Sequence, residues 1–427
     1  MEHALVRRNV SLHDDPLRAQ SLALVIGALV AVVVVAGCLA VALVRPRGDL
    51  GSAQLVVARE TGAMYVRVGD LWHPTTNLAS ARLILRTAAS PTLVNATDLE
   101  GVRRGPAIGI PGAPSSLGPT AAWDTWTVCD GRDTLVTAGD GTSPAERLDP
   151  GRSVLVTPRG ESAAITYLLY DGRRAAVDLR NAAVVRALRL DGVRPQPVSR
   201  ALLDTVPEVA PIAAPPVERS GSVGPMGATV GSVVQVVGTG ATDLYVVLAD
   251  GVQRVGEVAA DLIRLTYAGA SVGVPAVSPA AIAATPTGDR PAVGHLPDRA
   301  RPPATGPAVC VRWRAGASPN PVVSVGTPAD VEGAIVLPRA DGAGPQIDRV
   351  AMPSGRAAYV RAARVLADDG STGPTYLVAD DGTVHGVRDD AAASALGLTG
   401  PPIAAPWPVL AWLPRGPELG VVAAPAP

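Results

Sequence analysis

Residues 243–267 read DLYVVLADGVQRVGEVAADLIRLTY, and this stretch decides the fold. An apolar run that begins near Tyr245 ends at Asp250-Gly251, a pair that suits a type I′ hairpin because both central residues of that turn need a positive φ. After a second short strand, an apolar face with helical spacing is formed by Val258, Leu262, Ile263 and Leu265. An isolated hairpin is marginal in water, so the stretch predicts a hairpin covered by its own helix.

The same pattern occurs four times along the chain, as in a protein with internal repeats. The other copies are MYVRVGDLWHPTTNLASARLIL (64–85), TYLLYDGRRAAVDLRNAAVVRALRL (166–190) and TYLVADDGTVHGVRDDAAASALGL (375–398). Their predicted turns, with that of the third copy, are Gly69-Asp70, Asp171-Gly172, Asp250-Gly251 and Asp381-Gly382. The turn role explains these aspartates fully, so we assign them a structural role and not a catalytic one.

A membrane span is predicted from residue 22 to residue 44, which read LALVIGALVAVVVVAGCLAVALV without a charge. About 20 apolar residues suffice to cross a bilayer, and a buried core helix is rarely this long or this aliphatic. Arg7, Arg8 and Arg18 favour a cytoplasmic N-terminus, although Arg45 and Arg47 partly offset them. An alternative is that residues 35–38 (VAGC) form a lipidation signal, but apolar residues continue past the cysteine.

Two cysteines, Cys129 and Cys310, lie outside the span, each in a strand-like run with a tryptophan nearby (Trp126 and Trp313). We predict that these strands lie close together in a central core and that the cysteines form a structural disulfide. A metal site would need convergent histidines, and a reactive thiol pair would favour the C-x-x-C spacing; both stay open as alternatives, as do unpaired thiols. A stable disulfide implies an oxidising compartment outside the cytoplasm.

Composition excludes several classes of function. The 427 residues carry a formal net charge of −1, which gives no bulk attraction for nucleic acid. The chain contains no lysine, so it cannot form the phosphate-binding loop in which a lysine reaches the β- and γ-phosphates. No cofactor is predicted from the residues, and no metal site. A hydrophobic content of 47% favours a folded, turn-rich protein.

The expected fold is a single transmembrane helix followed by an extracytoplasmic α+β domain, in which four small hairpin-plus-helix repeats surround a discontinuous β-rich core. The expected segments are a short cytoplasmic segment (1–21), the transmembrane helix (22–44), repeat 1 (53–114), the first core segment (115–160), repeat 2 (161–206), a linker (207–235), repeat 3 (236–285), a loop with the second core segment (286–330), repeat 4 (331–398) and a C-terminal tail (399–427).

Together these features resemble EccB, a membrane component of the type VII (ESX) secretion machinery of mycobacteria and related actinobacteria. The most specific stretch is EHALVRRNVSLHDDPLRAQSLAL (2–24), and the segments at 77–85, 104–114 and 405–420 are similar to further family segments. Cys129 and Cys310 match the family's disulfide positions. Family members usually carry a further cytoplasmic stretch before this segment. We therefore expect either that the true start lies upstream or that this member lacks part of its cytoplasmic contact with partner subunits.

The resemblance implies the role of a structural subunit. Such a subunit assembles with other Ecc membrane subunits into a complex that exports small helical effector pairs. It implies a single-pass protein of the inner membrane, with lipid around residues 22–44, a cytoplasmic N-terminus and a periplasmic C-terminal domain. Two alternatives also come from the family, an ATP-binding or hydrolysing activity and a cell-wall (peptidoglycan) binding role. ATP is considered as a ligand only because this activity has been ascribed to the family.

Overall fold

The computed structural model describes residues 16–44, 50–139, 146–160, 165–237, 242–268, 273–316, 320–327, 331–365 and 373–421, with side chains from residue 20 to 40 in the first helix. The predicted cytoplasmic segment up to residue 15, together with Arg45 and Arg47, lies outside these residues. The chain forms two compact units, the first of residues 1–75, 89–107 and 427, and the second of residues 76–88 and 108–426.

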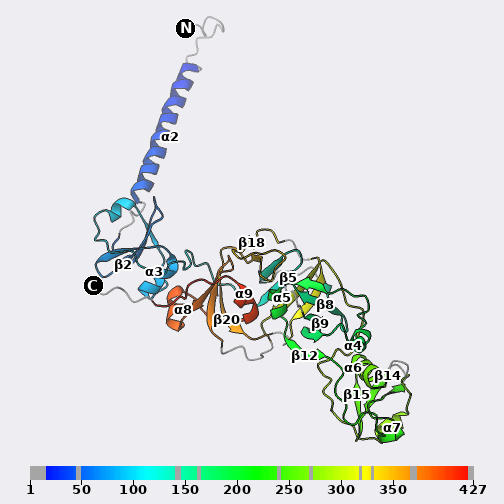
Figure 1. Cartoon of the computed structure of the whole chain (residues 1–427). Coiled ribbons are helices and arrows are strands. Elements are labelled where there is room, and N and C mark those ends of the chain that lie inside the picture. Colours follow the sequence, from blue (N-terminus) through cyan, green and yellow to red (C-terminus); the bar gives the residue numbers. More distant parts are fainter. Residues whose placement is uncertain are drawn as a thin grey trace, which may run out of the picture. The chain divides into compact units, whose positions relative to one another are not determined.

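The N-terminal helix α2 (Pro16–Val44) includes the whole predicted span (Figure 1). Its residues Gln20–Ala40 are long and apolar enough to cross a membrane, and their side chains are not buried against the rest of the chain. The helix continues through Cys38, which is exposed.

The first unit also contains a four-stranded sheet. Its strands, in sheet order, are β3 (Leu71–Thr75), β2 (Met64–Val68), β1 (Leu55–Ala58) and β4 (Thr92–Val94). The short 3₁₀ helix η1 (Ala96–Leu99) follows β4. β1 and β2 are antiparallel, whereas β4 runs parallel to β1. Val56, Val94 and Leu99 are fully or almost fully buried in the core of this unit.

The second unit is built around a seven-stranded sheet. Its strands, in sheet order, are β18 (Ile335–Val336), β19 (Arg349–Ala351), β6 (Thr134–Ala138), β5 (Thr125–Asp130), β16 (Ala308–Arg314), β17 (Val322–Gly326) and β7 (Glu146–Arg147). Because β5 and β16 are neighbours, segments 181 residues apart at their cysteines form the centre of one sheet. Alternate residues of these strands, such as Trp126, Val128 and Val311, pack into the main hydrophobic core.

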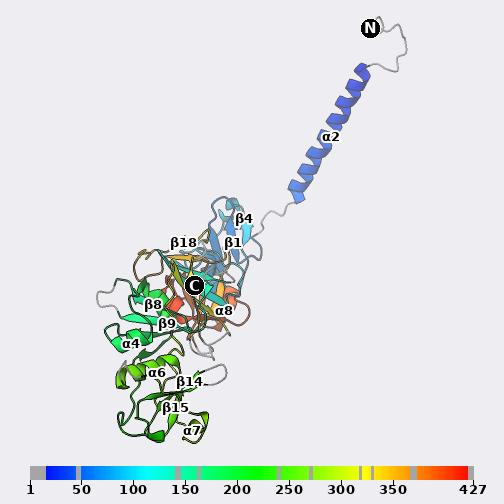
Figure 2. The ribbon, with the colours of Figure 1, turned by 90° about the vertical axis from the view of Figure 1, so that its right-hand side faces the viewer.

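Three smaller sheets accompany this core, and strands of two of them, β8 with β9 and β14 with β15, are labelled in Figure 2. One has the order β11 (Gln196–Val198), β8 (Ser153–Pro158), β9 (Thr166–Tyr170), β10 (Arg173–Val177), β12 (Glu208–Ile212). The second has the order β13 (Val233–Val237), β14 (Thr242–Val247), β15 (Val252–Val255). The third has the order β22 (Val384–Val387), β21 (Thr375–Val378), β20 (Ala358–Ala363), β23 (Ile403–Pro406).

A helix follows the hairpin in each of the four stretches. These helices are α3 (Leu78–Leu85), α4 (Ala182–Ala187), α6 (Glu257–Ile263) and α8 (Asp390–Leu396). Three of them start at a side chain that caps the free backbone N–H groups: Asn77, Asn181 and Asp389. α4 packs against α6, and α3 against α8. The remaining helical elements of the described residues are α5 (Arg200–Asp204), η2 (Pro225–Gly227), η3 (Arg264–Ala268), α7 (Pro279–Ala283) and α9 (Trp407–Trp412).

Several predicted segment boundaries are wrong. β8, placed in the first core segment, belongs to the sheet of the second repeat, and β12, placed in the linker, is its edge strand. β18 and β19, assigned to repeat 4, belong to the core sheet. β23 and α9, assigned to the tail, complete the fourth repeat, where β23 pairs in parallel with β20. Parallel strands pair across a long crossover connection, so local alternation in the sequence does not reveal their partners.

Candidate functional site

The structure joins Cys129 and Cys310 in a disulfide across the centre of the core sheet. The two cysteines are directly opposite each other in the β5–β16 register, with their Cα atoms 4.0 Å apart. Trp126 and Trp313 are opposite each other in the same register, three residues away. The cysteines therefore point to the face of the sheet opposite the tryptophans, and Cys310 is completely buried.

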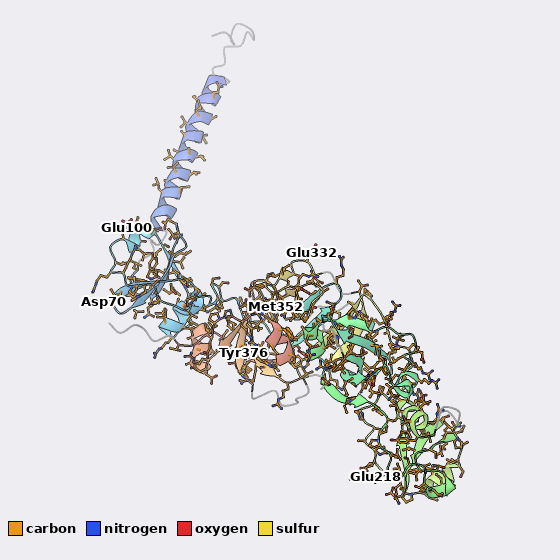
Figure 3. The ribbon with its side chains drawn as sticks, viewed as in Figure 1. Asp70, Glu100, Glu218, Glu332, Met352 and Tyr376 are labelled. Carbon is orange, nitrogen blue, oxygen red and sulfur yellow. A yellow bond between two sulfur atoms is a disulfide. The ribbon has the colours of Figure 1, made fainter. Side chains whose placement is uncertain are left out.

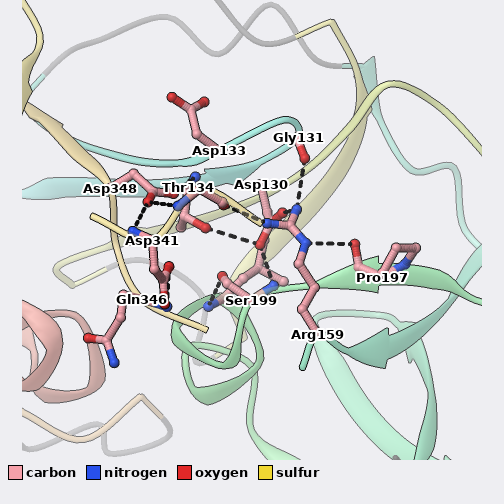
Figure 4. A network of polar contacts seen from close by, with 12 residues as sticks. Asp130, Gly131, Asp133, Thr134, Arg159, Pro197, Ser199, Asp341, Gln346 and Asp348 are labelled. Carbon is pink, nitrogen blue, oxygen red and sulfur yellow. Dashed lines mark hydrogen bonds and ion pairs between the residues drawn. The ribbon is translucent and has the colours of Figure 1, made fainter. Parts of the chain in front are cut away.

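A buried ion pair lies at the end of β5, where Asp130 meets Arg159 (Figure 4). The side chain of Asp130 is fully buried and that of Arg159 is 7% exposed. Besides Arg159, the carboxylate of Asp130 accepts hydrogen bonds from the backbone N–H of Ser199 and from the Thr134 hydroxyl at 3.3 Å. Burial raises the pKa of Asp130, while the bonds from Ser199 and the charge of Arg159 act in the opposite direction.

Arg159 also satisfies backbone carbonyls from three separate segments. It donates to the carbonyl oxygens of Gly131 at 2.7 Å, Gly342 at 3.3 Å and Pro197 at 3.4 Å. Since Gly131 follows a core strand and Pro197 lies in β11, one guanidinium connects the core sheet to the sheet of the second repeat. Ser199 continues the connection, because its hydroxyl caps α5 by accepting from the N–H of Leu202 at 3.2 Å.

A second buried carboxylate, that of Asp348, organises the edge of the core sheet. It accepts from the backbone N–H groups of Thr134 and Asp341, each at 2.7 Å, and of Gly342 at 2.6 Å. The loop before β19 is thereby fixed to β6, next to the Asp130–Arg159 pair (Figure 4). Each carboxylate and guanidinium in this network has a structural partner, so the network positions elements and leaves no free acid or base for catalysis among its members.

The four predicted turns differ in backbone conformation. Asp171 and Gly172 have φ of 46° and 70° and connect Tyr170 directly to Arg173, as the type I′ prediction requires. The type I′ prediction is wrong for the other two Asp-Gly turns, and the Gly-Asp turn of the first repeat does not have this conformation either. In the first, Gly69 has a positive φ (58°) and Asp70 does not; the hairpin side chains around Asp70 are drawn in Figure 3.

The third and fourth turns are longer than two residues. Val247 pairs with Val252, so four residues separate the strands, and Gly251 does not have a positive φ. Glycine is nevertheless required at position 251 because a Cβ would lie 2.3 Å from the carbonyl oxygen of Pro286. In the fourth turn Gly382 has a positive φ (82°), whereas Asp381 does not.

An Arg-Gly-Pro segment recurs in the first and fourth repeats, and it was not among the sites predicted from the sequence. Residues 104–106 and 415–417 both read RGP, and each segment runs parallel to the third strand of its repeat. The guanidinium of Arg104 lies 5.6 Å from the Tyr65 ring, and that of Arg415 lies 5.3 Å from the Tyr376 ring. Tyr65 and Tyr376, which stand near the start of the hairpins of the first and fourth repeats, are thus each covered by an arginine.

A buried histidine packs on the glycine of each segment. His73 contacts the carbonyl oxygen of Pro106 at 2.8 Å and His385 that of Pro417 at 3.2 Å, through Nδ1. Burial lowers the pKa of His385. A Cβ on Gly105 or on Gly416 would lie within 2.3 Å of the facing imidazole, so only glycine fits. The identical tripeptides in the sequence were the signal that could have revealed this arrangement.

No metal-ligating cluster is present in the described part of the chain, where histidine, cysteine, aspartate and glutamate form no group of three that could hold a metal ion. The two buried histidines lie in different units and each serves its own Arg-Gly-Pro segment. The arrangement of buried polar groups therefore serves to fix strands and loops, and the surfaces of the units remain for contacts with other molecules.

Comparison with known proteins assigns the family. The family model described as "Type VII secretion system ESX-1, transport TM domain B" matches residues 1–426. The ESX-3 secretion system ATPase EccB3 of Mycolicibacterium smegmatis is 34% identical, covering 97% of this chain and 86% of the relative. The ESX-1 secretion system ATPase EccB1 of Mycobacterium tuberculosis is 32% identical, covering 99% of this chain and 91% of the relative.

Solved structures agree with these matches. A chain of an intact ESX-5 inner membrane complex superposes with a TM-score of 0.74 at 30% identity, covering 99% of this chain and 92% of that one. The EccB3 dimer from the ESX-3 core complex gives a TM-score of 0.73 at 31% identity, covering 86% of this chain and 98% of that one. The chain belongs to the EccB family of type VII secretion proteins.

Proposed function

We propose that the chain is a membrane-anchored structural subunit of a type VII secretion complex, whose folded part supports assembly of the export machinery. The observation that carries this proposal is the match over 99% of the chain to a component of an intact ESX-5 inner membrane complex. The buried polar network supports it, because its charged groups are used to tie sheets together.

The proposed topology has a cytoplasmic N-terminus and a periplasmic domain after the helix. Arg7, Arg8 and Arg18 precede the apolar stretch Gln20–Ala40, as the positive-inside rule favours. The Cys129–Cys310 disulfide supports the same topology, because such bonds persist in oxidising compartments. A thiol-alkylating reagent applied to intact cells should leave both cysteines unmodified unless a reductant is added, and a reporter fused after residue 421 should signal from outside the cytoplasm.

The proposed partners are other Ecc membrane subunits. Mild detergent extraction of the full chain, followed by identification of the co-purifying proteins, tests this directly. We expect the other membrane components of one ESX system to co-purify and to be lost when the chain lacks residues 16–44. Purification of the chain alone from the native membrane would contradict the proposal.

The proposed assembly role needs no nucleotide bound to this chain. The relatives' names contain the word ATPase, so ATP hydrolysis is the rival function. Without lysine, the chain has no residue to play the lysine's role in a phosphate-binding loop. Mg²⁺-dependent hydrolysis of ATP by the purified full chain, above that of a buffer blank, would favour the rival function.

A further inference from the structure

Two identical Leu-Pro-Arg tripeptides line one groove of the second unit. Residues 337–339 follow β18, and residues 413–415 follow α9; in sequence they are 76 residues apart. Together with neighbouring side chains they enclose a volume of about 470 Å³, within the range of ligand pockets in proteins. The site joins the edge of the core sheet to the end of the fourth repeat.

The floor of the groove is apolar and fixed. Leu337, Leu413 and Ile347 are at most 5% exposed, so their side chains are held by the core. Trp412 lies beside them, and its indole N–H donates to the carboxylate of Asp204 at 3.2 Å, which fixes the ring. Gln346 also lines the groove, and its side chain points away from the Asp130 network (Figure 4).

The charged residues that line the groove are all basic. Arg339 and Arg415 are exposed and come from the two separate tripeptides, and none of the ten lining residues is acidic. Among the described residues, neither arginine forms an ion pair with a carboxylate. Arg415 is held against two aromatic rings, 5.3 Å from that of Tyr376 and 5.0 Å from that of Trp407 (Tyr376 is labelled in Figure 3). Its side chain is therefore ordered before any ligand binds, which lowers the entropic cost of binding.

We propose that this groove docks an extended acidic peptide segment of a partner protein. Carboxylates of the segment would pair with Arg339 and Arg415, since the planar guanidinium suits a bidentate carboxylate. An apolar side chain between the carboxylates would lie on Trp412 and the leucine floor, which is why a peptide fits better than a simple anion. This docking of an acidic segment does not depend on which complex the chain belongs to.

The test uses the full chain in detergent and a fluorescein-labelled octapeptide of alternating glutamate and leucine, measured by fluorescence anisotropy. Arg339→Gln and Arg415→Gln should each weaken binding about fivefold, and the double variant about 25-fold, as expected for partly exposed ion pairs. Arg301→Gln with Arg364→Gln makes the same change of charge on exposed arginines outside the groove and should leave binding within about twofold.

Two further variants separate a loss of peptide binding from a loss of packing. Arg339→Gln alone leaves the stacked Arg415 intact, so a loss of binding by this variant does not result from altered packing of the fourth repeat. The double charge reversal, with Arg339→Glu and Arg415→Glu, should bind the octapeptide that has lysine in place of glutamate. The proposal is overturned if the double glutamine variant binds the peptide as tightly as the wild type does. It is also overturned if an octapeptide with glutamine in place of glutamate binds as tightly as the acidic peptide, or if inorganic phosphate alone displaces the acidic peptide fully. Finally, it is overturned if light scattering shows that the substitutions dissociate a dimer of the chain.

Discussion

Asp130→Asn is the substitution that tests most directly whether the buried network holds the second unit together. One oxygen of the Asp130 carboxylate faces the Arg159 guanidinium and the other faces the Ser199 N–H, so both positions must accept hydrogen bonds. An asparagine has a single acceptor oxygen, and its NH₂ group would oppose one of these donors. The guanidinium of Arg159, 7% exposed, would also lose its counter-ion.

The expected loss follows from these two effects. Removal of one partner from a buried ion pair typically costs about 3–5 kcal/mol, because the remaining charge stays buried without compensation. That loss corresponds to an unfolding equilibrium constant about 150- to 5,000-fold larger, since each 1.4 kcal/mol is about tenfold. Arg159 keeps its bonds to the carbonyls of Gly131, Pro197 and Gly342, which favours the lower end of the range.

Urea unfolding of the full chain in detergent, followed by tryptophan fluorescence, measures the effect, since Trp123 and Trp126 are buried in the same core. Asp133→Asn is the matched control. Asp133 is three residues away and pairs with Arg349, but the two side chains are 35% and 30% exposed, so we expect a loss below about 1 kcal/mol. Equal losses for the two variants would refute the reasoning, because they would mean that burial of the pair does not matter.

Three further predictions concern stability. Replacing both bridging cysteines with alanine should lower the free energy of unfolding by up to roughly 5 kcal/mol in the chain-entropy model, because the bond joins residues 181 apart in sequence; equal urea midpoints would refute it. Gly105→Ala should cost about 1–3 kcal/mol because its Cβ would overlap His73, whereas Gly101→Ala, with open space around it, should cost less than about 1 kcal/mol in the same assay. Burial lowers the pKa of His385, so the unfolded chain binds a proton at higher pH than the folded chain, and stability should be lost as the pH falls below about 6.5. Thermal melts at pH 7.5 and 5.0 should show this loss in the wild type and less of it in His385→Gln.

Local pattern was sufficient to predict the hairpins and their helices. Tyrosine-led apolar runs followed by turn residues gave a pair of strands at each of the four places, and an amphipathic stretch gave the helix. The adjacency of β5 and β16 was predicted from two cysteines in similar surroundings, and the register that sets Cys129 opposite Cys310 agrees with it. These features depend on residues close in sequence or on a residue type rare in the chain.

The strands that precede and follow each hairpin could not be predicted in the same way. β8 and β20 are buried on both faces, so they lack the alternation that marks a half-buried strand. β12 contains a proline and three exposed residues, and it pairs in parallel with β10 across a long connection that includes α4, β11 and α5. Nothing local distinguishes Arg159 from the many exposed arginines, because its burial depends on a partner that lies at the end of a different strand.

The connectivity of the core sheet explains why this network matters for a subunit that works by assembly. β5 and β6 come from residues 125–138, whereas β16, β17 and β19 come from residues 308–351, so the second and third repeats are inserted between two halves of one sheet. The disulfide joins the two halves, and Arg159 joins the core sheet to the second repeat at the same end of β5. A surface that contacts several partners at once needs its strands and loops held in fixed positions by such bonds. Substitutions at Asp130 should therefore impair assembly of the secretion complex in proportion to the free energy of unfolding that they remove.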